Sequence, residues 1–174
     1  MKNNVAYKNY AYKNYAYRNY AYTLIELLIG ISIISIIFSV GFASYRDFSR
    51  RQALIGVTKA IVSDLRLLQQ KSLAGEKPDS CTTLSGYQMD ITSSTVYNFQ
   101  AVCSTGAILN YVTIKTVDLA ENDVTISSTS DPIIFKILGQ GTNLTSDAII
   151  TIFNSKIDKT SIVNVGIGGD VYTE

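Results

Sequence analysis

One apolar run near the N-terminus constrains this chain more than any other feature. It reads YTLIELLIGISIISIIFSVGFA over residues 22–43 and carries a single charge, at Glu26. From Leu27 to Tyr45 the chain has no charged side chain, and a helix of that length nearly spans the hydrocarbon core of a bilayer. The run also exceeds the roughly 7 to 15 apolar residues of a secretory signal. The sequence therefore predicts a transmembrane helix over residues 22–44.

The segment before this run is basic and repetitive. Residues 6–22 read AYKNYAYKNYAYRNYAY, a five-residue repeat that matches the period of neither a helix nor a strand. Positive charges oppose translocation, so they favour a cytoplasmic N-terminus, although Arg46, Arg50 and Arg51 beyond the run weaken this bias. We interpret residues 1–21 as a basic leader, and a tyrosine-rich self-association motif is the alternative. The basic residues of this leader are Lys2, Lys8, Lys13 and Arg18.

After the apolar run, over residues 45–75, the pattern becomes amphipathic and contains no proline. Apolar residues recur there at a spacing of three or four, which is typical of one face of a helix. Gly75, followed by Pro78, is a typical helix end. We therefore expect one continuous helix whose second half packs on a sheet. Its predicted apolar stripe consists of Leu54, Val57, Ile61, Leu65 and Leu68.

Residues 76–174 contain short runs rich in β-branched and aromatic residues, separated by polar clusters, and such runs predict strands. No gap between them is long enough for the helical crossover of a parallel pair, so we expect an antiparallel meander and an α+β fold. The glycines at 139–141 and 166–169 are interpreted as turn residues, because no helix start follows them. The predicted strand runs are GYQMDI, TVYNFQAV, ILNYVTIKTV, DVTIS, PIIFKIL, DAIITIFN and TSIVNVGI.

The two cysteines of the chain, Cys81 and Cys103, lie in this predicted sheet domain. A hairpin folded about Ser93 would place them nearly opposite each other on neighbouring strands. If the domain is exported, a disulfide is the simplest interpretation, and two free buried thiols in a reducing cytosol are the alternative. A bridge that closes a loop of about 20 residues would stabilise the fold by roughly 3 kcal/mol.

The composition argues against catalysis, metal binding and nucleic-acid binding. Histidine, the commonest general base and metal ligand, does not occur among the 174 residues. Two cysteines alone do not complete a zinc site. Removing the leader's four basic residues from the 15 in the chain leaves 11, against 14 acidic residues, so no strongly basic surface is expected. We expect no enzyme activity, no cofactor and no metal.

The run YTLIELLIGISIISIIF resembles the N-terminal signature of type IV prepilins and type II secretion pseudopilins, in which a lone glutamate follows a short basic leader. The distal segment, residues 133–174, is similar to the end of the GspH/FimT group of minor pseudopilins, where a Phe-x-x-x-Gly segment precedes two strands and a Gly-rich hairpin. Together these resemblances cover about a third to a half of the chain. They imply a pilin-like fold, in which a long N-terminal helix packs on an antiparallel sheet.

The resemblance also implies site residues. A prepilin peptidase would cut between Ala21 and Tyr22 and methylate the new amino group of Tyr22. Ala21 stands where these families place glycine, and Ala43 stands where major pilins often have proline. Glu26 would pair with the Tyr22 amine of an adjacent subunit, because each charge is costly to leave alone in a bundle of low dielectric constant.

The expected function is therefore that of a membrane-anchored minor pilin or pseudopilin in a type IV pilus or a type II secretion pseudopilus. Expected partners are other subunits, the prepilin peptidase and the inner-membrane assembly platform. The chain would cross the inner membrane once, with its N-terminus in the cytoplasm and its C-terminal domain outside. Two alternatives stay open: a FimT-like DNA-binding pilin that uses Lys156 and Lys159, and a plain bitopic surface protein that is never cleaved.

Overall fold

The computed structural model describes residues 22–106 and 108–173. The leader, its repeat and the predicted cleavage residue Ala21 lie outside the described residues. Contacts divide the chain into two units, one ending at Gly41 and the other beginning at Phe42. Helix α1, Leu24–Ala74, contributes to both units, and all eight strands belong to the second.

The C-terminal end of α1 is built as the sequence predicts. Gly75 adopts a φ of +63°, a left-handed conformation that glycine tolerates without strain. Its N–H donates to the Ser72 carbonyl at 3.2 Å, and the Glu76 N–H donates to the Lys71 carbonyl at 3.1 Å. This pair of bonds is the Schellman motif, which satisfies carbonyls that the helix leaves without a partner. The chain therefore leaves the helix at Ala74.

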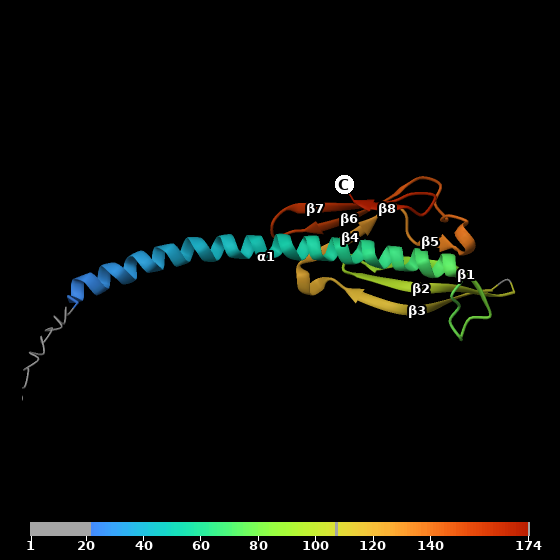
Figure 1. Cartoon of the computed structure of the whole chain (residues 1–174), viewed down its shortest axis with the longest axis horizontal. Coiled ribbons are helices and arrows are strands. Elements are labelled where there is room, and N and C mark those ends of the chain that lie inside the picture. Colours follow the sequence, from blue (N-terminus) through green and yellow to red (C-terminus); the bar gives the residue numbers. More distant parts are fainter. Residues whose placement is uncertain (1–21, 107, 174) are drawn as a thin grey trace, which may run out of the picture. The chain divides into compact units, whose positions relative to one another are not determined.

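The strands form two antiparallel sheets of four strands each, with the orders β3-β2-β1-β5 and β4-β6-β7-β8. Figure 1 shows β2 and β3 of the first sheet on one side of the C-terminal part of α1, and β6 and β7 of the second sheet on the other side. Short 3-10 turns, η1 and η2, cover Ala120–Asn122 and Ile137–Gly139. The strands are β1 Thr83–Ser93, β2 Val96–Thr105, β3 Ile108–Asp118, β4 Val124–Ser128, β5 Ile133–Lys136, β6 Ala148–Asn154, β7 Lys159–Val165 and β8 Val171–Thr173.

Each predicted run falls on a strand, but the expected simple meander is wrong at β4 and β5. Strand β4 pairs with β6, whereas β5 returns to the first sheet and pairs with β1. In that pairing Tyr87 lies opposite Phe135 and Met89 lies opposite Ile133, and all four side chains are buried. The β1–β5 pairing thus places four large apolar side chains in the core, which is favourable. The order of the strands along the chain does not predict this pairing.

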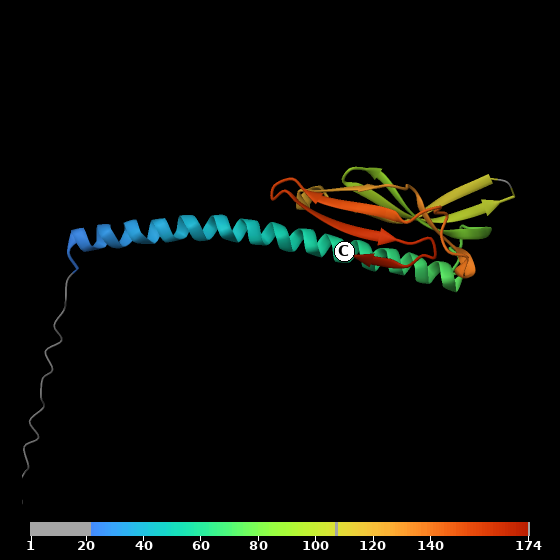
Figure 2. The same ribbon diagram turned by 90° about the horizontal axis from the view of Figure 1, so that it is seen from above.

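The core of the second unit lies between α1 and the inner faces of both sheets. All five residues of the predicted apolar stripe are buried, and Ile61 and Leu65 are completely inaccessible to solvent. In the perpendicular view of Figure 2, most strands of both sheets lie on one side of the C-terminal part of the helix, and the stripe shares one core with both sheets. The structure therefore confirms the α+β fold of one long helix packed on antiparallel sheet.

The two cysteines are joined in a disulfide, as the sequence predicted, and both are buried. The expected register was nevertheless inaccurate. Cys103 lies opposite Leu84, and Cys81 precedes the first residue of β1. Irregularities in the β1–β2 ladder, between Leu84 and Gly86 and between Ile91 and Ser93, shift the pairing away from a regular hairpin.

Candidate functional site at the start of the long helix

The first turn of α1 is capped by Thr23. Its hydroxyl oxygen accepts a hydrogen bond from the Glu26 N–H at 3.3 Å, and its carbonyl accepts one from the Leu27 N–H at 3.2 Å. The spacing Thr-x-x-Glu is the signature of a capping box, in which the acid would bond back to the threonine N–H. The residues alone carry this signal, although the cap is not among the predictions made above from the sequence. The cap fixes where the helix begins.

The Glu26 side chain does not complete that box within the residues that the structure describes. It makes neither a hydrogen bond nor an ion pair there, and the residue is exposed. A carboxylate in the first turn interacts favourably with the helix dipole. In hydrocarbon, however, a charged side chain costs up to about 3 kcal/mol on insertion scales. Among the described residues, the Glu26 carboxylate therefore has no counter-ion that would offset this cost.

Glu26 lines part of a shallow groove of about 450 Å³, whose lining is mostly apolar. Gly30 lies one helical turn from Glu26, and a Cβ added there would meet no atom within 4 Å. Glycine inside a helix costs about 1 kcal/mol relative to alanine, and nothing in the described fold of this chain requires it here. The position instead allows close approach from outside. The groove is lined by Tyr22, Glu26, Leu27, Gly30, Ile31 and Ile34.

The helix beyond the groove presents apolar side chains to its surroundings. Within the described residues, α1 is the one helix that is long and apolar enough to cross a membrane, and its most apolar window is unburied. The hydroxyls of Ser32, Ser35 and Ser39 donate to carbonyls one turn earlier in the same helix, at 2.8–2.9 Å. These polar groups are thus satisfied internally, as a lipid environment requires.

The structure brings two of the predicted site residues together, since Tyr22 and Glu26 line the same groove. The disulfide belongs to the second unit and has no part in this groove. Lys156 and Lys159, the residues named for DNA contact, are exposed near the β6–β7 turn, where Asp158 lies between them. Over residues 22–106 and 108–173, no group of three or more His, Cys, Asp or Glu side chains could hold a metal ion.

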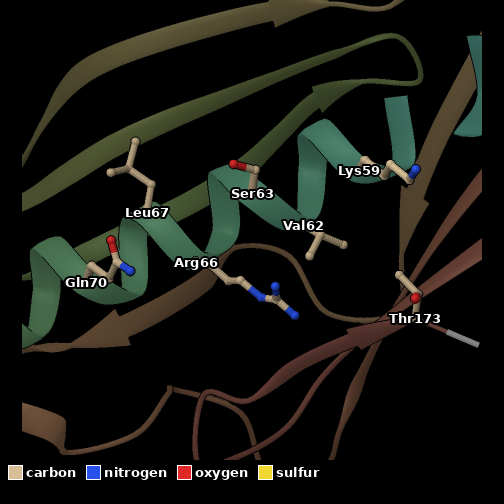
Figure 3. A pocket seen from close by; sticks show the side chains of 7 residues that line it. All are labelled: Lys59, Val62, Ser63, Arg66, Leu67, Gln70 and Thr173. Atoms are coloured by element: carbon tan, nitrogen blue, oxygen red, sulfur yellow. The ribbon is translucent and has the colours of Figure 1, made fainter. Parts of the chain in front are cut away.

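A second groove, of about 580 Å³, lies in the second unit between α1 and β8, and Figure 3 shows the side chains that line it. The Arg66 side chain extends from the helix, and its Nη2 donates to the Val171 carbonyl at 3.2 Å. Strand β8 is the last strand of its sheet, so this bond satisfies a carbonyl of an edge strand. No sequence pattern revealed this contact, because its partners are 105 residues apart. We therefore assign this arginine a structural role.

Comparison with known proteins identifies a motif in the N-terminal segment. A family model described as the prokaryotic N-terminal methylation motif matches residues 17–42. No curated protein and no solved structure matches the chain. The matched residues include Tyr22, Glu26 and most of the apolar helix, and they support a type IV pilin or pseudopilin. The chain thus carries a type IV pilin-like methylation motif at the residues that form the capped start of α1.

Proposed function

We propose that this chain is a minor pilin or pseudopilin that assembles into a type IV pilus or a type II secretion pseudopilus. The observation that carries the proposal is the exposed Glu26 carboxylate, which has no partner in the described chain and lies inside the methylation motif. The protein would act as a structural subunit and would not turn over a substrate. The resemblance of residues 133–174 to the GspH/FimT group favours a minor subunit.

Cleavage before Tyr22 would create an amino group at the edge of the same groove. That amine on one subunit would pair with the Glu26 carboxylate of the next subunit, because both charges are costly in the apolar bundle unless they are paired. The Thr23 cap holds the backbone of the first turn, and Gly30 leaves room for a neighbouring chain. Pairing of these charges would fix the axial register between subunits.

The proposed location follows from the same residues. The first half of α1 would anchor the subunit in the inner membrane, with the basic leader in the cytoplasm and the disulfide-bonded domain outside. The prepilin peptidase would act on the leader, and the assembly platform would extract the processed subunit into the filament. A plain bitopic protein would need neither step.

Processing is tested by mass spectrometry of the N-terminus of the protein isolated from the membranes of its host. The proposal predicts a chain that begins at Tyr22 and carries a methyl group on its amine. A chain that still begins at Met1 in assembled filaments would contradict the proposal and favour the bitopic alternative. This measurement also decides whether Ala21 is accepted at the cleavage site.

Assembly is tested with Glu26→Gln, compared with Glu121→Gln as a control. Glutamine keeps the capping-box capacity of the first turn but removes the charge, and Glu121 is an exposed acid of η1. Truncating one partner of a buried charge pair costs about 2–5 kcal/mol, so incorporation into filaments should fall more than tenfold. The control should incorporate normally. Undiminished incorporation of Glu26→Gln would refute the pairing.

A further inference from the structure

A second cluster of side chains that lie outside the core is found at the end of the apolar run. It combines exposed aromatic rings with arginines over ten residues of α1, all within the second unit. We call this cluster the collar. The collar consists of Phe42, Tyr45, Arg46, Phe48, Arg50 and Arg51.

The aromatic rings of the collar have no place in the described core. Phe42, Tyr45 and Phe48 are 63%, 68% and 59% exposed, respectively. Burying such large side chains is favourable, so their exposure on a helix indicates a surrounding that is not pure water. Aromatic side chains concentrate at the boundary between hydrocarbon and lipid headgroups, and the collar overlaps the end of the charge-free run.

The arginines of the collar lack anionic partners. The Arg46 guanidinium lies 5.9 Å from the centroid of the Phe42 ring. Among the described residues the salt bridges are Lys71–Glu76 and Lys115–Asp64, so the three collar arginines pair with no carboxylate there. Asp47 is the single acid between residues 42 and 51, which leaves this stretch with a net charge of +2. Its cationic groups are therefore available to anions.

On the proposed insertion, the length of chain between Glu26 and the collar would place these charges at a membrane surface. Twenty residues separate Glu26 from Arg46 in the sequence, and twenty helical residues rise about 30 Å, the thickness of the hydrocarbon core. If the start of α1 lies at one boundary of the core, the collar lies at the other. Long arginine side chains near a helix end reach out to the headgroups from such a position.

We propose that the collar binds the phosphate groups of anionic phospholipids at the outer surface of the membrane and so sets the depth of the inserted subunit. This proposal rests on the membrane insertion proposed above. The guanidinium group is planar and presents paired N–H donors that match phosphate oxygens. The positive-inside tendency disfavours arginines on the exported side, and phosphate binding gives them a favourable environment there. The free subunit is held in the membrane until assembly breaks these contacts.

The test uses the full chain in nanodiscs that contain phosphatidylcholine and phosphatidylglycerol in equal amounts. Native mass spectrometry of the released protein counts the lipids of each kind that remain bound. The variant Arg46→Gln/Arg50→Gln/Arg51→Gln is compared with Lys136→Gln/Lys156→Gln/Lys159→Gln, which removes the same charge from exposed residues of the sheet domain. Each basic group at an anionic surface contributes about fivefold, so the collar variant should lose the preference for phosphatidylglycerol by about a hundredfold.

The wild type and the lysine control should retain phosphatidylglycerol selectively, and excess inorganic phosphate should not displace it. Equal retention of both lipids by the wild type, or an equal loss in the lysine control, would overturn the proposal. A collar variant that keeps its lipid preference but fails to enter filaments would assign the arginines to a neighbouring subunit instead. Alkaline extraction of host membranes is done first, because release of the chain there would contradict membrane insertion itself and not the collar alone.

Discussion

Reduction of the Cys81–Cys103 disulfide should destabilise the second unit by about 3 kcal/mol. The two cysteines are 22 residues apart, and closing a loop of that length removes about this much conformational free energy from the unfolded chain. We expect the hairpin to stay paired without the bridge, because the β1–β2 ladder extends, with its two irregularities, from Thr83 opposite Ser104 to Ser93 opposite Val96. The stabilisation should therefore act mainly through the unfolded state.

The assay is urea unfolding of the full chain in mild detergent, with and without reductant, followed by near-ultraviolet circular dichroism. For slopes of about 1–3 kcal/mol per molar urea, the midpoint should fall by about 1–3 M on reduction. The double variant Cys81→Ser/Cys103→Ser serves as the control, since reductant should not move its midpoint. Amide exchange in β1 and β2 should stay protected after reduction.

Two results would refute this reasoning. A change below about 1 kcal/mol would mean that the unfolded chain already keeps the two cysteines close together. Loss of exchange protection along β1 and β2 under native conditions would mean that the bridge holds the hairpin itself, so the effect would belong to the folded state.

Two further predictions concern the sheet domain. Gly86→Ala should destabilise it by about 1–3 kcal/mol in the same urea assay, because the new Cβ would lie 2.4 Å from the Phe135 carbonyl oxygen, whereas Gly56→Ala, where a Cβ meets nothing within 4 Å, should be neutral or stabilising. Equal effects of the two changes would contradict this. Burial, and then the charge of Asp64, raise the pKa of Tyr97 above its unfolded value of 10.0. The folded protein therefore loses stability as the pH rises above 10.0, because the unfolded chain then releases the Tyr97 proton more readily than the folded one. Tyr97→Phe should remove this loss in unfolding measured from pH 9 to pH 11, and an unchanged pH dependence would contradict the assignment.

The sequence was most informative where a single periodicity decides the structure. The five apolar positions of the stripe on α1 are all buried, and each β-branched run became a strand. Both patterns depend only on which face of an element meets the core, which is local information. The end of α1 was predictable for a similar reason, since Gly75 followed by Pro78 marks it in the sequence and the glycine has a positive φ.

The pairing of strands could not be predicted in the same way. Strand β5 joins β1 through contacts about 50 residues apart, and no local pattern distinguishes that partner from β4 or β6. The register at Cys103 depends on ladder irregularities that a regular hairpin does not anticipate. Conversely, the spacing between Thr23 and Glu26 does indicate the N-terminal cap of α1, although the cap is not among the predictions made from the sequence. The proposed partner of Glu26 lies on another molecule, so a single chain shows only the unpaired carboxylate.

Strand β3 has a consequence for how such subunits can associate. It is an edge strand whose exposed apolar residues would invite another chain to extend the sheet. The ladder with β2 skips Ile114, and Lys115 turns back to Asp64 of α1 at 2.7 Å. An interrupted ladder and a lysine that reaches toward the helix should resist strand addition by a second copy, as edge strands of natural sheets do to avoid amyloid-like growth. If the chain assembles as proposed, neighbouring copies would thus associate through their helices and not through this sheet edge.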